Sequence, residues 1–289
     1  MEYCNGINTE IKTQNLTYQI DGIVAVIEGP DRSQFFYGED IFLSDYFNDI
    51  TREKNWYNQG FDVIDTKPFL NIQKVKDSLT NCLYQICKAE RVNVNKETFN
   101  LDDYHKYVTE EKHIDIVKKT RQLEPKDFEF DLDLFLAASK HYFNRDLSWM
   151  NSGGYNPKII TRINKPQSNH FNPPHKDIYQ VYDETREIPP MVNIWIPICG
   201  VNNGVGLPVA PGSHLINESK IFRTRAGATV NGLKFNVNCV KDWNSVNDMV
   251  TICPSESEMI VFSSFLIHGL ARNTHHDMTR MALEFRLFG

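Results

Sequence analysis

The chain of 289 residues lacks several patterns that would assign it to a specialised class of protein. Its six cysteines include no C-x-x-C pair, which argues against a disulfide framework or a zinc ribbon. The longest apolar stretches, such as "MIVFSSFLI", are far too short for a membrane-spanning helix. The first residues have neither a basic flank nor an apolar run, so no signal peptide is expected and a cytoplasmic location is the default.

Clusters of basic residues are also missing. The net charge is −6 and the sequence pI is about 5.9, and the short runs "KVK" and "VKKTR" sit in segments of mixed charge. We therefore expect neither a nucleic-acid nor a membrane partner, and a small molecule is the expected ligand. The oligomeric state leaves no signature in the sequence.

The pattern of the chain changes near residue 150. Residues 1–150 are predicted to be mostly helical, with an early strand at "GIVAVIE" entered through Asp21-Gly22. Helices are expected at 69–87, 101–119 and 131–143, with aspartates near the starts of the last two. The apolar stripe predicted for the first of these helices consists of Ile72, Val75, Leu79, Cys82 and Ile86.

Residues 151–289 read as short extended runs separated by turn residues. The runs are "KIITRI", "MVNIWIPI", "GLPVA", "GATV", "EMIVF" and "RMALEFRLF". Many short strands at regular spacing predict a sandwich or barrel, of which a jelly roll is one closed form. With no linker between the halves, we expect a single domain over 1–289, in which the helical part packs on and caps a jelly-roll core.

The stretch "FNPPHKDIYQ" contains the first candidate metal ligands. In an extended segment, His175 and Asp177 point to the same side and can converge on one ion, while Lys176 faces away. The third ligand must come from elsewhere, and His268 at the end of an apolar run is a better candidate than His214 in a Pro-Gly turn. Two histidines and one carboxylate form the ligand set of non-haem Fe(II) oxygenases. The alternative is that the H-K-D triplet is a charged surface turn.

Two strands contain further candidate site residues. Alternation along the last strand places Arg280 on the same face as Glu284 and Arg286, where a guanidinium could bind a carboxylate with two hydrogen bonds. Arg272 and Arg286 are rivals for this role, and Arg280 could instead be an edge residue paired with Glu284. In "MVNIWIPI", Val192, Ile194, Ile196 and Ile198 form a face suited to lie under the N-terminal helices, and Met191, Asn193 and Trp195 form the other face.

Three segments together resemble the phytanoyl-CoA-hydroxylase-like branch of the Fe(II)- and 2-oxoglutarate-dependent dioxygenases. They are "HKD" at 175–177, "WIPICGVNNGVGLPVAPGSH" at 195–214 and "HGLARNTHHDMTR" at 268–280. The resemblance covers about residues 155–289, with "DGIVAVIE" similar to the family's early strand. Arg280 follows His268 by twelve residues, slightly more than is usual in the family, and Leu270 stands where a small polar residue is common.

The resemblance implies a double-stranded β-helix, a jelly roll of mainly β structure with flanking helices. It implies an iron site of His175, Asp177 and His268, with Arg280 on the distal carboxylate of 2-oxoglutarate and Trp195 or Asn193 lining the cosubstrate pocket. The implied reaction uses Fe(II), 2-oxoglutarate and O2 to hydroxylate a substrate, and the presence of Asp177 argues against a halogenase.

The sequence leaves the substrate and two other functions open. We expect a small polar metabolite or saccharide, with Tyr179, Tyr182 and Arg186 in the loop "QVYDETREIPPM" as candidate contacts. One alternative is a cupin-like metal-binding enzyme or sensor that does not use 2-oxoglutarate and needs no arginine clamp. The other is a β-sandwich binding module without a metal.

Overall fold

The computed structural model describes residues 12–151, 158–168, 170–202 and 204–289 of the chain. Its larger sheet has the strand order β4-β13-β6-β14-β5, and every neighbouring pair in it is antiparallel. These strands are β4 (Phe61–Asp65), β13 (Glu258–Ser263), β6 (Met191–Cys199), β14 (Arg280–Phe288) and β5 (Ile160–Asn164).

A smaller sheet has the order β2-β1-β12-β7. Its strands are β1 (Thr13–Ile20), β2 (Ile23–Pro30), β12 (Asp248–Ile252) and β7 (Leu207–Val209). Single bridges from Val209 to His268 and from His268 to His175 extend this sheet beyond β7. Two candidate ligands are therefore neighbours in one sheet, although they lie far apart in the sequence.

The pairing of the core segments is nested. The first core segment along the chain, β5, pairs with the last, β14, and the segment at His175 pairs with that at His268. Inside these pairs along the chain, β6 pairs with β13, and β7 pairs with β12. Because consecutive segments also alternate between the two sheets, except for β7 and β12, which pair within the smaller sheet, the arrangement is a double-stranded β-helix. The expected fold class is confirmed, and each of the strand-like runs named for residues 151–289 contains a strand.

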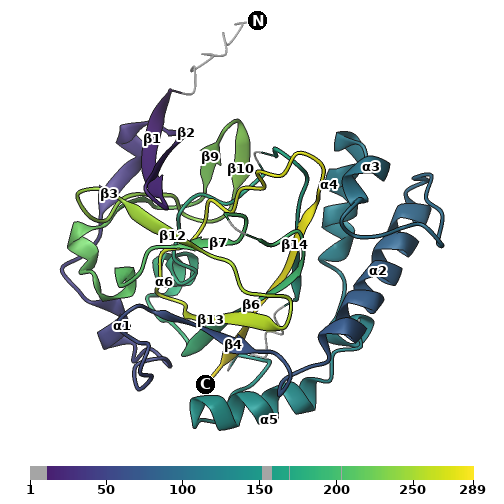
Figure 1. Ribbon diagram of the computed structural model, residues 1–289. Coiled ribbons are helices and arrows are strands. Elements are labelled where there is room, and N and C mark those ends of the chain that lie inside the picture. The colour runs from purple at the N-terminus through teal and green to yellow at the C-terminus, as the bar shows by residue number, and fades with distance from the viewer. Residues whose placement is uncertain (1–11, 152–157, 169, 203) are drawn as a thin grey trace, which may run out of the picture.

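Helices cover the outer face of the larger sheet (Figure 1). They are α2 (Ile72–Ala89), α3 (Tyr104–Tyr107), α4 (Glu110–Thr120) and α5 (Leu132–Phe143). Alternate residues of β6, from Val192 to Ile198, are buried in the same apolar cluster as Leu79 of α2 and Phe135 of α5. The predicted aliphatic face of β6 thus lies under the helices, and Trp195 points to the interior of the barrel, where it packs with Phe262.

Three of the helices begin at a polar residue that caps the helix N-terminus. Asn71, Thr109 and Asp131 each accept a hydrogen bond from a backbone N–H in the first turn of α2, α4 and α5. The single helix expected over 101–119 is instead two helices, because Val108 is extended and Thr109 starts a new helix. The predicted stripe of α2 is partly wrong: Ile72, Cys82 and Ile86 are only half-buried, and the buried positions are Val75, Ser78, Leu79, Leu83 and Cys87.

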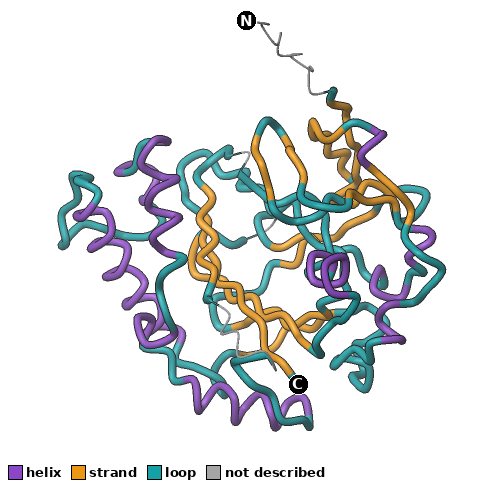
Figure 2. Tube along the Cα trace, turned by 180° about the vertical axis from the view of Figure 1, so that it is seen from behind, coloured by secondary structure: helices purple, strands orange, loops and turns teal. Residues whose placement is uncertain are grey.

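The first 150 residues contain more strand than expected. Besides β2, they supply β1, β3 (Phe35–Tyr37) and β4, where one early strand was predicted. Asp21 and Gly22 have positive φ angles and connect β1 to β2 in a tight hairpin. Seen from behind in Figure 2, the strands form the centre of the molecule. Among the described residues, no helix has the length and apolar character that crossing a membrane requires.

Short elements complete the described fold. They are the helices α1 (Leu43–Tyr46) and α6 (Tyr179–Thr185), the 3-10 turns Arg32–Gln34, Pro125–Phe128, Ser213–Leu215 and Glu218–Lys220, and the strands β8 (Phe222–Thr224), β9 (Ala228–Val230), β10 (Leu233–Phe235) and β11 (Val240–Asp242).

Candidate metal centre

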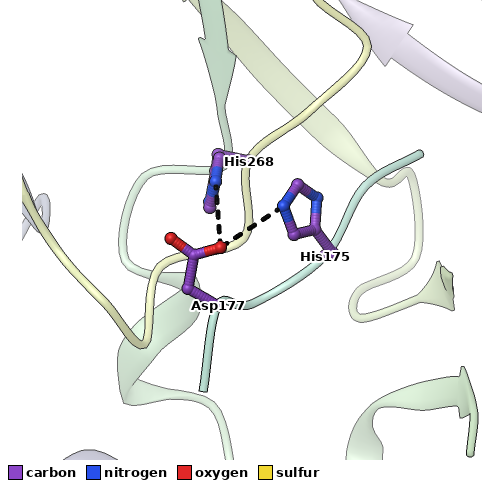
Figure 3. A group of neighbouring side chains, drawn as sticks. All are labelled: His175, Asp177 and His268. Atoms are coloured by element: carbon purple, nitrogen blue, oxygen red, sulfur yellow. Dashed lines mark ion pairs between the residues drawn. The ribbon is translucent and has the colours of Figure 1, made fainter. Parts of the chain in front are cut away.

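His175, Asp177 and His268 converge inside the barrel (Figure 3). Two backbone hydrogen bonds, from His175 N to His268 O at 2.9 Å and from His268 N to His175 O at 3.0 Å, hold the two segments side by side. Asp177 follows directly, before α6 begins. The three side chains are at most 3% exposed, so the reading of H-K-D as a surface turn is wrong.

The distances fit a metal ion. Asp177 Oδ1 lies 3.5 Å from His175 Nε2 and 3.9 Å from His268 Nε2, and all three ligand atoms lie within 4.8 Å of one another. An ion bonded at about 2.1 Å to each ligand needs ligand atoms roughly 3 to 3.5 Å apart. Small side-chain movements therefore suffice to bring all three atoms onto one ion.

The histidine tautomers leave the inward nitrogens free. The Nδ1 atoms of His175 and His268 lie 2.8 Å from Pro173 O and 3.1 Å from Leu266 O, so each Nδ1–H donates to a backbone carbonyl. Each Nε2 is then a lone-pair acceptor that is buried without a hydrogen-bond partner among the described residues. Burial, together with neighbouring His175, lowers the pKa of His268 to about 4, so this ring is neutral and able to bind a metal at pH 7.

Arg286 holds the third ligand in its charged form. Its Nη2 lies 2.8 Å from Asp177 Oδ1, and its Nε donates to Asp177 Oδ2 at 3.2 Å. Burial opposes ionisation of Asp177, but Arg286 and the two histidines outweigh it and keep the pKa of this carboxyl well below its usual range. Arg286, one of the rivals for the cosubstrate clamp, is therefore bound to the aspartate itself.

Among the residues that the structure describes, Arg280 is a buried cation without a carboxylate partner. It is 1% exposed, its Nη1 donates to Asn164 Oδ1 at 2.7 Å, and its Nη2 donates to Gly206 O at 2.8 Å. Its guanidinium lies 5.2 Å from the ring centre of Trp195. Burial and nearby Arg162 lower the pKa of Arg280 to about 10, which leaves it protonated at pH 7. The alternative of an edge residue paired with Glu284 is wrong, since Arg280 is buried and Glu284 pairs with another arginine.

A cavity of about 60 Å³ connects the two histidines to Arg280. Its lining includes His175, His268, Arg280, Trp195 and Asn164. Asn193 shares the inward face of β6, but it is not among the lining residues; its Oδ1 accepts from Ser264 Oγ at 3.4 Å.

An ion pair that the sequence analysis did not predict lines this cavity. Arg162 of β5 donates from Nε and Nη2 to the two carboxylate oxygens of Glu284, both at 3.0 Å. Both residues line the cavity. Part of the signal is in the sequence, because Glu284 lies on the same face of its strand as Arg280, and Arg162 is a charged residue inside the strand-like run "KIITRI".

Three other residues near the site have contacts that the sequence did not predict. His214, the competing ligand, lies apart from the three-residue group and packs edge-on against Tyr57, with ring centres 4.8 Å apart. The first part of the loop expected after H-K-D is the helix α6, and Tyr179 is buried with its hydroxyl on Glu218 rather than lining a substrate wall. Lys176 does face away from the metal site, but it is buried and paired with Glu218.

Comparison with known proteins finds similarity in structure alone. No family model matches the sequence, and no curated protein matches it either. Similar solved structures include AviO1 from Streptomyces viridochromogenes Tue57, with 14% identity, a TM-score of 0.49, and coverage of 84% of this chain and 94% of that one. EctD from S. alaskensis, solved with 2-oxoglutarate and 5-hydroxyectoine, has 10% identity and a TM-score of 0.47, covering 90% and 86% of the two chains. The epimerase SnoN, in complex with Fe3+, alpha ketoglutarate and nogalamycin RO, has 12% identity and a TM-score of 0.45, covering 81% and 80%.

Proposed function

We propose that this protein is a non-haem Fe(II) oxygenase of the phytanoyl-CoA-hydroxylase-like type, which couples the oxidative decarboxylation of 2-oxoglutarate to the hydroxylation of a small polar metabolite or saccharide. One observation carries the proposal: two buried histidine nitrogens without hydrogen-bond partners among the described residues face one ionised carboxylate oxygen. Two histidines and a carboxylate that leave further positions open are the ligand set typical of this chemistry.

The protein's own groups prepare the site before any metal binds. Pro173 O and Leu266 O fix the His175 and His268 rings with their Nε2 lone pairs pointing inward. Arg286 keeps Asp177 ionised, so that metal binding does not require removal of a proton from the carboxyl group. Iron(II) held by these three residues, with 2-oxoglutarate and O2, would supply the oxidising chemistry.

Arg280 is the residue we assign to the distal carboxylate of 2-oxoglutarate. Its guanidinium lines the same cavity as the histidines, and its hydrogen bonds among the described residues go to neutral oxygens of Asn164 and Gly206. A buried cation of this kind gains strongly from a carboxylate ligand. Trp195 forms one wall beside it, with its ring centre 5.2 Å from the guanidinium.

The test compares the purified wild type with His175→Ala. With Fe(II), 2-oxoglutarate and air, the wild type should form succinate even without substrate, and His175→Ala should form very little. His141→Ala is the matched control, because His141 is an exposed residue of α5. A wild type that neither binds 2-oxoglutarate nor converts it would contradict the proposal, and metal binding without 2-oxoglutarate binding would favour the cupin-like alternative.

A further inference from the structure

A polar groove lies on the surface beside the metal cavity. It has a volume of about 510 Å³ and is lined by Arg272, Thr274, Gln167, Ser168, Asn231 and Glu28, among others. Arg272 and Thr274 also line a second hollow of about 240 Å³. Neither hollow contains any of the three candidate metal ligands. Arg272 therefore stands at the junction of two surface hollows.

Arg272 has no acidic partner within the described parts of the chain. Its Nη2 donates to Val26 O at 3.3 Å, and its Nε is buried without a hydrogen-bond partner among the described residues. Glu28 lines the same groove, but the described side chains form no ion pair between it and Arg272. Half-burial lowers the pKa of Arg272, with no neighbouring charge to offset the effect. Such a guanidinium is stabilised most by a bound oxyanion.

The groove and the metal cavity share a wall. The Arg272 guanidinium lies 5.3 Å from the ring centre of Phe171, and Phe171 lines the metal cavity together with Ala271, the residue before Arg272. A molecule held at Arg272 would thus lie next to Phe171, one of the side chains that line the cavity of His175 and His268.

The segment that carries Arg272 is held in place by side-chain hydrogen bonds. Asn273 Nδ2 donates to Asn164 O and to Met278 O, both at 2.8 Å, and Gln167 Nε2 donates to Thr274 O at 2.7 Å. Asn164 is also the residue that accepts from Arg280. The backbone that carries Arg272 is therefore fixed on its C-terminal side, and the contact with Val26 O orients the guanidinium, which lowers the entropy cost of binding a ligand.

Two of the four arginines around the site are paired with a carboxylate side chain, and two are not. Arg162 is paired with Glu284 and Arg286 with Asp177, whereas Arg280 and Arg272 have no carboxylate partner among the described residues. In the proposed function, 2-oxoglutarate supplies the anion for Arg280. One cation next to the cavity is then left for a second anion, which the cosubstrate does not provide.

We propose that Arg272 binds a carboxylate or phosphate group of the substrate, so that the substrate is an acidic small molecule. The assignment of this anion to the substrate rests on the proposed oxygenase function. The anion site itself rests on the groove and the unpaired guanidinium, and it can be tested without iron.

The test is chemical modification of arginine by phenylglyoxal in the metal-free, full-length protein, with the modified positions identified by mass spectrometry. Inorganic phosphate and malonate are added in separate arms, with 2-oxoglutarate as a third. Phosphate or malonate should slow modification of Arg272 several-fold and leave Arg121, an exposed residue at the end of α4, unaffected. Protection at a lower concentration of phosphate than of malonate would identify the ligand group as a phosphate. The reverse order would identify it as a carboxylate.

Three results would overturn the inference: no protection of Arg272 by either anion, equal protection of Arg272 and Arg121, or stronger protection by 2-oxoglutarate than by both other anions. The last result would make Arg272 the cosubstrate clamp. Thermal unfolding is the second measurement, because an anion that binds the folded state raises Tm. The increase caused by the protecting anion should be lost in Arg272→Gln and kept in Arg272→Lys and Arg121→Gln; an increase that persists in Arg272→Gln also overturns the inference.

The two proposals fail in different ways. Iron-dependent succinate formation without protection of Arg272 removes only the acidic-substrate inference. Protection of Arg272 in a protein that forms no succinate leaves the anion site intact and removes the oxygenase function.

Discussion

Lys176 Nζ donates to Glu218 Oε1 at 2.7 Å, and both side chains are almost completely buried. Tyr179 donates its hydroxyl to the other oxygen of the same carboxylate, also at 2.7 Å. Lys176 stands between two candidate metal ligands and Tyr179 is the first residue of α6, so Glu218 fixes the segment that carries His175 and Asp177 from the side opposite the metal.

The first prediction concerns this buried ion pair. Glu218→Gln should lower the free energy of unfolding by about 3–5 kcal/mol, because removal of one partner leaves the other charge buried and unpaired. The double variant Lys176→Met/Glu218→Gln should lose less than the single variant. Urea unfolding of the metal-free protein measures these two variants and the single variant Lys176→Met. A double variant as unstable as the sum of the two single variants would show that the pair is not coupled.

The second prediction separates the two arginines of β14. Arg286→Ala should weaken Fe(II) binding by about 10- to 100-fold, because Arg286 orients and charges Asp177. Arg280→Ala should instead weaken 2-oxoglutarate binding and leave the metal content nearly unchanged. Equilibrium dialysis with Fe(II) and calorimetric titration with 2-oxoglutarate give the two affinities, and Arg121→Ala is the surface control. Equal loss of 2-oxoglutarate affinity in both variants would mean that Arg280 is not a specific clamp.

The third prediction is an acid-dependent loss of stability at His113. This residue lies on the buried face of α4, and its Nδ1 lies 3.1 Å from the Tyr104 hydroxyl. Burial lowers its pKa from 6.5 to about 4; Glu110 opposes the shift, and His170 and Lys165 add to it. The unfolded chain therefore binds a proton at higher pH than the folded chain does, so the stabilisation is complete above pH 6.5 and declines as the pH falls towards 4.

Between pH 7.5 and pH 5, this residue alone should remove about 2 kcal/mol from the free energy of unfolding. His113→Gln should be less stable than the wild type at pH 7.5, but its stability should fall less over the same interval. Urea unfolding at the two pH values measures the difference. An identical fall in both proteins would exclude His113 as a source of acid sensitivity.

The fourth prediction tests the expectation of a single domain. Because α2, α5 and the outer face of the larger sheet share one apolar cluster, tryptophan fluorescence and far-ultraviolet circular dichroism should report the same unfolding midpoint. Ile196→Ala should lower the free energy of unfolding by about 2–5 kcal/mol and move both transitions together. Two separate transitions, only one of which moves, would indicate that the helical part and the barrel unfold independently.

Much of the fold could be predicted because buried positions appear in the sequence as apolar residues at the period of a strand or a helix. The alternation in "MVNIWIPI" placed Ile196 under the helices and Trp195 in the barrel, and both lie there. The other strands of the first 150 residues leave a weaker signal: β3 and β4 are short edge strands, and β1 fully buries only Leu16 and Tyr18. The gap between α3 and α4 was missed for a related reason, since Val108 is apolar and continues the helical pattern across the break.

The sequence by itself determined the residue types of the site. His175 and Asp177 are two positions apart in an extended segment, so their shared side follows from backbone geometry alone. The inward faces of β6 and β14 follow from the same alternation. Only the tertiary structure decided which charges neutralise one another, because ion pairs join segments whose separation along the chain carries no information about their distance in space. It paired Arg286 with Asp177 and Arg162 with Glu284, and it left Arg280 and Arg272 as cations without carboxylate partners among the described residues.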